Sequence, residues 1–255
     1  ITYGDWSSDV CSSDLGISYL GVITALLFIR ERELFREDIN RNSTKIRQGI
    51  NYVKARPDIL AVMFTVFFAT SFGLNFNIFN TMMATKVFGK GAAQYGALGS
   101  ILAIGSLSGA IISARLEKKR GPRFVMVGAM IFSLLLITAS FAPNYAIYSF
   151  FLPLIGCVAL LTFIGANTMV QTRTDSAIRG RVMGIYLTVF LGGTPLVSPL
   201  IGVMTELIGT RLTITICGGI SLIAATITYL QFRDRSDAPE SFAVADVLET
   251  AYDNK

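Results

Sequence analysis

Six long apolar blocks, separated by short polar loops, constrain this chain more than any other feature of its sequence. Each block holds about 20 residues with few charges, which is the length an α-helix needs to cross the bilayer core of about 30 Å. Lipid cannot satisfy open backbone groups, and the blocks lack the alternation of barrel strands, so each is expected to be a helix. The blocks lie near residues 58–79, 93–114, 124–141, 146–170, 182–208 and 212–232.

Composition agrees with a membrane protein. Hydrophobic residues make up 52% of the 255 positions and charged residues 15%, and the mean hydropathy is +0.57. A soluble domain of this length needs more charge to cover its surface. The net charge of +5 does not call for a nucleic-acid partner, because lysine and arginine mark the cytoplasmic loops of membrane proteins.

The basic residues are divided unequally between alternate loops. The positive-inside rule places the richer side in the cytoplasm, which predicts a multi-pass membrane protein with a cytoplasmic C-terminus. The richer side carries eight basic residues in 30–56, five in 115–123, three in 173–181 and three after 232, whereas the other side has only Lys86, Lys90 and Arg211.

The first 29 residues differ from the rest. Residues 4–15, GDWSSDVCSSDL, resemble a sequencing-library adapter translated in one frame, so we interpret 1–15 as a sequencing artefact and exclude it from the fold. Residues 16–29 are apolar but too short to span comfortably, and we expect them to be a truncated transmembrane helix.

A polar connection precedes the six blocks. Residues 30–57 are expected to lie in the cytoplasm, and within them 44–55 places Ile46, Ile50 and Val53 on one helical face. This spacing predicts an amphipathic helix along the membrane surface. The remaining segments are a six-transmembrane-helix bundle at 58–232 and a cytoplasmic tail at 233–255.

Catalysis is not predicted. The chain has no histidine, no paired carboxylates within a span and no arrangement of a nucleophile with a base. We therefore expect neither an enzyme nor a metal or cofactor site.

Amide side chains within the blocks are the first candidates for a binding site. A buried amide without a partner costs a few kcal/mol, so each should face another helix or a wet cavity. Interhelical contacts and substrate ligands both remain open as roles. The candidates for a substrate cavity are Asn75, Asn77, Asn80, Gln94, Asn167 and Gln171.

Glycine and proline mark two further features. Gly105 and Gly109 have the GxxxG spacing that lets helices approach closely. The block at 182–208 carries residues that interrupt helical hydrogen bonding, which indicates either a hinge or a packing kink. These hinge candidates are Gly192, Gly193, Pro195 and Pro199.

A long basic connection followed by six spans resembles the second half of a major facilitator superfamily transporter. The loop at 115–123, RLEKKRGPR, resembles the basic Gly-Arg loop between the second and third helices of each half. Gly121 and Arg123 match that pattern, Pro122 replaces a basic residue, and the acidic position is shifted to Glu117.

The loop at 171–186, QTRTDSAIRGRVMGIY, resembles the segment before the eleventh helix in the bacterial efflux branch that includes the enterobactin exporter. The matching positions are Gln171, Asp175, Arg179, Gly180 and Arg181.

The resemblance implies an all-α polytopic protein of the bacterial cytoplasmic (inner) membrane, namely the six-helix C-terminal half of a twelve-helix major facilitator fold. It implies secondary active transport of a small organic solute by alternating access, with efflux of a siderophore or drug-like molecule as the branch-level expectation. The implied partners are the lipid bilayer, the small-molecule substrate and a missing N-terminal half of the same transporter. The inner loops would close a cytoplasmic gate, or serve simply as positive-inside anchors. The gate candidates are Arg115, Glu117, Gly121, Arg123, Asp175, Arg179 and Arg181.

A channel or a non-transport structural membrane subunit remains an alternative. A retinal protein needs a Schiff-base lysine in its last helix, and 212–232 contains none.

Overall fold

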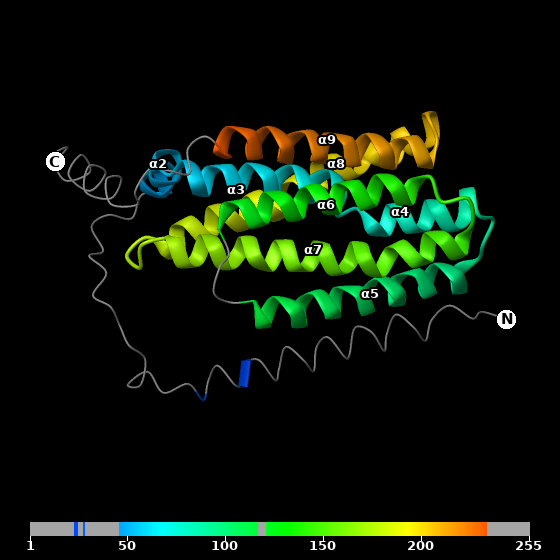
Figure 1. The fold of residues 1–255 in the computed structure, drawn as a ribbon, viewed down its shortest axis with the longest axis horizontal. Coiled ribbons are helices and arrows are strands. Elements are labelled where there is room, and N and C mark those ends of the chain that lie inside the picture. Colours follow the sequence, from blue (N-terminus) through cyan, green and yellow to red (C-terminus); the bar gives the residue numbers. More distant parts are fainter. Residues whose placement is uncertain (1–22, 25–27, 29–45, 117–120, 234–255) are drawn as a thin grey trace. The chain divides into compact units, whose positions relative to one another are not determined.

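The computed structural model describes residues 23, 24, 28, 46–116 and 121–233, and every regular element among them is helical (Figure 1). The chain divides into two units, Ile1–Thr44 and Lys45–Lys255, and nearly all described residues belong to the second. Its elements are α2 (Ile46–Ala55), α3 (Pro57–Phe68), the π-helical turn η3 (Ala69–Gly73), α4 (Phe76–Met82), the π-helical turn η4 (Met83–Val87), α5 (Ala92–Arg115), α6 (Pro122–Ser140), α7 (Tyr145–Arg173), α8 (Arg179–Leu207) and α9 (Thr210–Arg233).

Six helical stretches are long and apolar enough to cross a membrane, so the predicted all-α polytopic fold is confirmed. Five of them agree with the predicted blocks to within three residues at either end. The exception continues to Val87, where the sequence predicted an end near residue 79. The stretches are Pro57–Val87, Ala92–Arg115, Pro122–Ser140, Tyr145–Arg173, Arg179–Leu207 and Thr210–Phe232.

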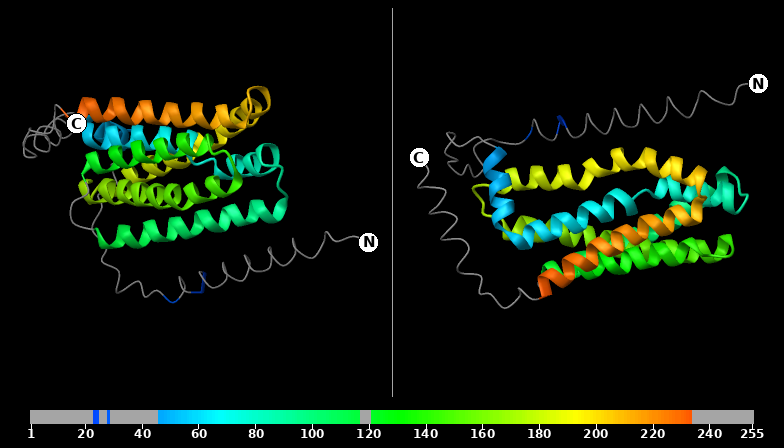
Figure 2. Two further views of the ribbon diagram at one scale, coloured as in Figure 1. Left: turned by 45° about the vertical axis from the view of Figure 1, so that its right-hand side comes forward. Right: turned by 90° about the horizontal axis from the view of Figure 1, so that it is seen from above.

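Some predictions fall on other parts of the chain. Those for 1–15 and for the tail beyond Arg233 lie outside the described residues, as does Glu117. Only three residues of 16–29 are described. Helix α2 occupies the segment for which an amphipathic helix was predicted, and it runs across the end of the bundle, at a steep angle to the long helices (Figure 2).

The long helices pack side by side in the order α5, α7, α6, α9, and α3 with η3 packs against both α9 and α8 (Figures 1 and 2). Two glycines bring α5 and α7 together. A Cβ atom at Gly105 would lie 2.1 Å from the carbonyl oxygen of Pro153, and one at Gly109 would lie 2.3 Å from that of Cys157. The GxxxG pair therefore permits the close approach that its spacing indicated.

Two hydrophobic clusters form the core of the bundle. One includes Val53, Val62 and Met169, and the other includes Phe79 and Leu152. Phe190 of α8 packs against both clusters and joins them. Large apolar side chains also cover much of the outer surface, as a lipid-facing surface requires; examples are Ile104, Phe150, Leu196 and Leu207.

The first span is interrupted between Gly73 and Phe76. Helix α3 ends in the π-helical turn η3, and Leu74 and Asn75 separate that turn from α4. The Asn75 side-chain amide donates to the Ser71 carbonyl at 2.7 Å, and the Asn75 carbonyl accepts from the Phe79 amide at 3.0 Å. One asparagine therefore both ends the first part of the span and begins the second, because its side chain replaces a backbone donor.

Candidate functional site

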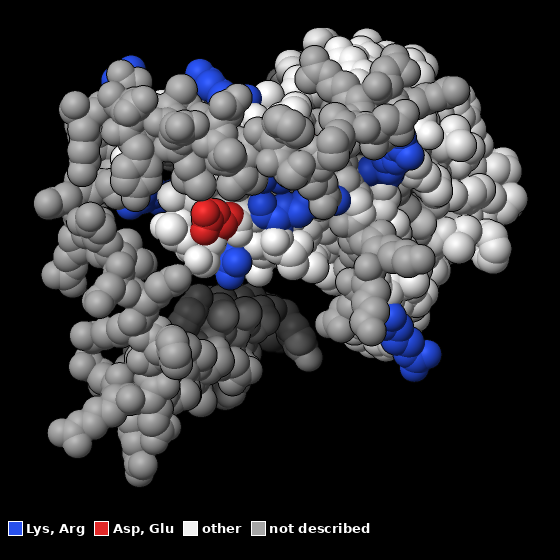
Figure 3. All heavy atoms as spheres, turned by 60° about the vertical axis from the view of Figure 1, so that its left-hand side comes forward, with Lys and Arg blue, Asp and Glu red and all other residues white. Residues whose placement is uncertain are grey.

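Basic side chains gather at one end of the bundle, which we call the basic end (Figure 3). It comprises α2, the last turn of α5, the first turn of α6 and the connection from α7 to α8. The opposite end, called the far end, holds the connections at 88–91, 141–144 and 208–209. The described cations near the basic end are Arg47, Lys54, Arg56, Arg115, Arg123, Arg173, Arg179 and Arg181.

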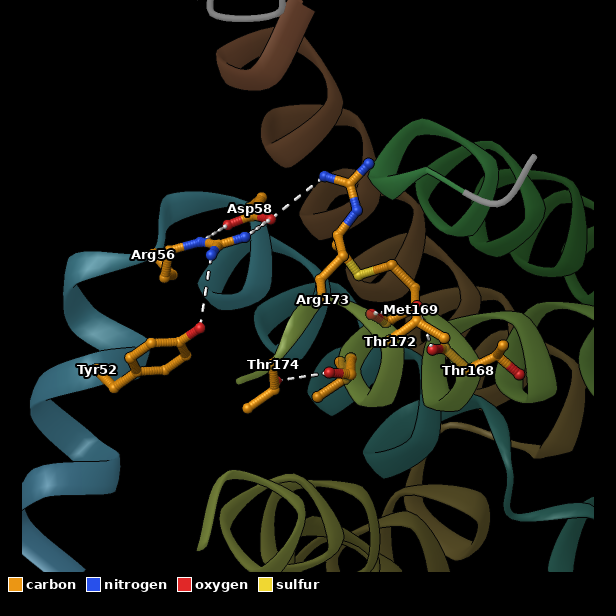
Figure 4. Close-up of polar contacts among 9 residues, drawn as sticks. Tyr52, Arg56, Asp58, Thr168, Met169, Thr172, Arg173 and Thr174 are labelled. Carbon is orange, nitrogen blue, oxygen red and sulfur yellow. Dashed lines mark hydrogen bonds and ion pairs between the residues drawn. The ribbon is translucent and has the colours of Figure 1, made fainter. Parts of the chain in front are cut away.

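A buried carboxylate lies at the basic end among these cations (Figure 4). Asp58 is only 8% exposed and belongs to the first turn of α3. Both of its carboxylate oxygens accept hydrogen bonds from Arg56, each at 3.0 Å. Arg173, the last residue of α7, approaches Asp58 Oδ2 with Nη1 at 3.4 Å. We call Arg56, Asp58 and Arg173 the Asp58 cluster.

The Asp58 cluster connects two spans that are far apart in sequence. The two-point contact with Arg56 is local and charge-assisted, which makes it the stronger of the two pairs. The contact with Arg173 joins the start of α3 to the end of α7 through a single, longer interaction. Tyr52 supports Arg56 from α2, with its hydroxyl 3.5 Å from Nη1 (Figure 4).

The sequence predictions missed the Asp58 cluster. Arg173 was counted only as one of three basic residues in its loop, and Asp58 was treated as the first residue of a block. One local signal was present. Proline is common at the first position of a helix, and an acidic residue in the first turn is stabilised by the positive end of the helix dipole. That signal locates the acid but does not identify its distant partner.

The loop between α7 and α8 and the first turn of α8 contain three of the predicted gate residues. Arg181 donates from Nη1 to the side-chain oxygen of Gln48 at 2.9 Å and so links α8 to α2. Arg179 lies 3.4 Å from the Thr174 carbonyl. Asp175 is exposed, and its described contact is the backbone amide of Ala177 rather than either arginine.

The other described gate candidates also lie at the basic end. Arg115 is exposed and ends α5. Gly121 precedes α6 in an extended conformation, and Arg123 is exposed in the first turn of that helix. The structure therefore gathers the predicted gate residues at one end of the bundle, but the interhelical ion pair among the described residues there is that of Asp58 with Arg173.

The six amide candidates are not brought together in one group. Gln94 is exposed in the first turn of α5 at the far end, whereas Gln171 is exposed near the basic end of α7. Gln171 donates to the side chain of Asn167, one turn earlier in the same helix. Asn77 is exposed, and Asn80 is buried and accepts a hydrogen bond from the Tyr148 hydroxyl at 2.8 Å.

The Asn75 side chain makes hydrogen bonds both within its own span and to another span. It is 4% exposed at the interruption of the first span. The Ser198 hydroxyl of α8 lies 2.7 Å from Asn75 Oδ1 and also 2.7 Å from the Thr194 carbonyl. A hydroxyl has one hydrogen, so Ser198 can bond the neighbouring span or its own helix, but not both at once.

The hinge candidates lie close to this contact. Helix α8 is continuous from Arg179 to Leu207, with Pro195 and Pro199 inside it and both exposed. Gly193 is buried, and the Ser71 hydroxyl of η3 occupies the space where its Cβ would lie. Gly192 is exposed. The described break is thus in the first span, against which α8 packs through Gly193.

This arrangement of single contacts between spans suits movement of helices relative to one another. Within residues 46–116 and 121–233, no group of three histidine, cysteine or carboxylate side chains could hold a metal ion. The polar contacts join α3 to α7 at the basic end, and Asn75, at the break between η3 and α4, to α8 within the span. Each of these is a single contact between side chains, which can break and re-form while the backbone hydrogen bonds of the helices stay intact.

Comparison with known proteins agrees with this description. A family model of the major facilitator superfamily, described as transmembrane secretion effector, matches residues 13–249, a region that contains all six spans. A search among curated proteins gave no match. The chain therefore belongs to the transmembrane secretion effector family of the major facilitator superfamily, and it is a multi-pass membrane transport protein.

Proposed function

We propose that this six-helix bundle is one half of an exporter that moves a small organic molecule, siderophore-like or drug-like, out of the bacterial cytoplasm by alternating access. The family match over residues 13–249 supports membrane transport. The branch-level assignment, to exporters like that of enterobactin, rests on the loop that contains Asp175, Arg179 and Arg181.

The observation that carries the proposal is the interruption of the first span at Asn75. In transporters, discontinuous helices expose backbone polar groups within the membrane, where substrates and coupling ions bind. Here the interruption is held by a buried asparagine whose second partner, Ser198, belongs to a different span. Such an interruption therefore favours a transporter over a structural subunit, which has no need of exposed backbone polar groups within the membrane.

We further propose that the basic end faces the cytoplasm, as the positive-inside rule requires, and forms the cytoplasmic gate. Arg173 would leave Asp58 when the inner ends of α3 and α7 separate, while Arg56 keeps the carboxylate paired. The geometry supports this division of roles, because the Arg56 contact has two bonds at 3.0 Å and the Arg173 contact has one at 3.4 Å. The second six-helix half would complete the central cavity.

The test is transport into everted membrane vesicles from a bacterial host that lacks its own major exporters, made with the gene that encodes this chain. The probes are ethidium, an aromatic organic cation, and a catecholate siderophore. We expect energy-dependent accumulation of a probe that saturates with concentration and is reduced by excess unlabelled probe. Flux that rises linearly with concentration and shows no competition would instead favour a channel.

An internal control separates transport from folding. Asn75→Ala should lower the transport rate, and Lys90→Gln should not, because Lys90 is exposed at the far end and Asn75 is buried between two spans. Both variants must be present in the membrane at parental levels for the comparison to count. Equal rates for the two variants would contradict a role for the interruption.

A further inference from the structure

Helix α2 has a face that is fixed to the bundle. Gly49 and Val53 are buried on this face. A Cβ at Gly49 would lie 3.1 Å from Ile185 Cδ1 and 3.2 Å from Arg181 Cβ, so only glycine lets α2 lie this close to α8 without displacing a neighbour. The Arg181 guanidinium adds a hydrogen bond to Gln48 at 2.9 Å. The position of α2 is thereby coupled to the first turns of α8.

The opposite face of α2 is exposed and carries two cations. Arg47, Ile50, Asn51 and Lys54 are all exposed, and their spacing places them on one side of the helix. Ile50 is 41% exposed between the two cations. No ion pair joins Arg47 or Lys54 to a described acidic residue. Because α2 crosses the end of the bundle, its axis would lie near the membrane plane when the long helices span the bilayer (Figure 2).

We propose that this face of α2 binds anionic lipid headgroups at the basic end, and that the Gln48–Arg181 contact transmits this binding to α8. Two cations separated by two helical turns match the phosphate groups of neighbouring lipids, and Ile50 between them reaches the apolar boundary beneath the headgroups. Other basic side chains gather at the same end (Figure 3) and add to the same field. The occupant is therefore a lipid surface, identified by complementary charge. The inference does not depend on what the protein transports.

The magnitude follows from the number of cations. Each lysine or arginine near an anionic leaflet strengthens the association about fivefold, so Arg47 and Lys54 together contribute about 25-fold. The contribution falls with salt, because exposed charges are screened within about 10 Å at 0.1 M ionic strength.

The experiment measures amide hydrogen exchange of the whole chain in lipid nanodiscs. One preparation contains only phosphatidylcholine, and the other contains a large fraction of anionic phosphatidylglycerol. We expect the amides of α2 to exchange more slowly in the anionic discs, by up to about 25-fold at low salt, and the difference to shrink at high salt. The double variant Arg47→Gln, Lys54→Gln should lose this lipid dependence.

A matched control uses the far end, where Lys86 and Lys90 are also exposed. The double variant Lys86→Gln, Lys90→Gln removes the same charge and should keep the lipid dependence of α2. Equal exchange of parental α2 in the two lipids would overturn the proposal, and so would a dependence that survives in the Arg47, Lys54 variant. Either result would favour another protein segment, rather than lipid, as the partner of this face.

The coupling to α8 has its own variant. Gln48→Ala removes the acceptor of the Arg181 hydrogen bond but leaves both cations of α2 in place. In the parent, we expect the first two turns of α8 to gain protection in anionic discs together with α2. In Gln48→Ala, α2 should still respond to the lipid and α8 should not. An undiminished response of α8 would overturn the coupling.

Discussion

The glycine contact between α5 and α7 gives the sharpest prediction, since its geometry involves backbone on both sides. In Gly105→Ala the new methyl group would lie 2.1 Å from the Pro153 carbonyl oxygen and 2.4 Å from the Pro153 Cα. Cβ atoms in real structures do not approach other heavy atoms closer than 3.0 Å, so the helices must separate by about 0.9 Å. No side chain can turn aside to avoid this, because the atoms in contact belong to the main chain.

The expected destabilisation is about 2–3 kcal/mol, near the upper end of the usual cost of overpacking. For a chain of this size that corresponds to a fall of roughly 5–10 °C in the midpoint of thermal unfolding. Gly99→Ala is the matched control in the same helix, because nothing lies within 4 Å of a Cβ at that position. There, alanine improves helix propensity by up to about 1 kcal/mol, so the midpoint should stay equal or rise.

The assay is the fraction of purified chain that remains monodisperse in gel filtration after heating in detergent. Gly105→Ala should lose this fraction at a lower temperature than the parent, and Gly99→Ala should not. Identical midpoints for the two alanine variants would refute the close backbone approach of α5 and α7. A Gly105→Ala variant more stable than the parent would refute it more strongly.

Three further predictions use the same heating assay. Asp58→Asn leaves two guanidinium groups without their carboxylate and should lower the free energy of unfolding by about 2 kcal/mol, which is less than for a fully buried pair because both arginines are partly exposed. The control Asp175→Asn, at an exposed position, should change this free energy by under about 0.5 kcal/mol. Equal effects of the two variants would rule out the Asp58 cluster. Asn75→Ala loses two interactions and should cost about 1–2 kcal/mol, so a variant as stable as Asn77→Ala would contradict the bridge between spans. Tyr148→Phe removes one interhelical hydrogen bond and should cost about 0.6–1.7 kcal/mol; no loss would mean that its buried partner amide finds another donor.

The six spans were predictable because each needs only local information. A run of about 20 apolar residues fixes a transmembrane helix whatever its neighbours are. The close approach at Gly105 could be predicted from spacing as well, because a four-residue repeat of small residues lies on one helical face. The extension of the first span to Val87 was not predicted, because Asn75, Asn77 and Asn80 lower the hydropathy of its second part.

The location of the helix break could not be predicted from proline positions. Pro195 and Pro199 lie within a continuous α8, while the break occurs at Asn75, where no proline is present. Prolines are tolerated in membrane helices when nearby groups satisfy the freed carbonyls. The break instead occurs at a buried asparagine whose side chain bonds the Ser71 carbonyl of its own span and also Ser198, which is 123 residues away in sequence.

The Asp58 cluster shows the same limit for ion pairs. The sequence predictions for the loops placed the cations at one end of the bundle, but Asp58 and Arg173 are separated by 115 residues. Which basic residue reaches a given acid depends on how helices pack, and the composition of the loops carries no information on that. Arg181 was a predicted gate residue, yet its partner Gln48 is uncharged and lies in another element.

The π-helical turn η3 bears on how this protein tolerates a change in residue number. A π-helical turn holds one residue more than an α-helical turn, so deletion of one residue from Ala69–Gly73 would restore regular α-helix. Because the extra residue fits into nearly the same rotation and rise, the helix beyond it would keep nearly the same orientation to α3. Deletion of one residue from the regular helix α3 would instead rotate everything beyond it by about 100°, and Asn75 and Asn80 would face away from Ser198 and Tyr148. Homologues can therefore differ by one residue in this turn and keep these contacts, whereas a single insertion or deletion within α3 would change which spans they join.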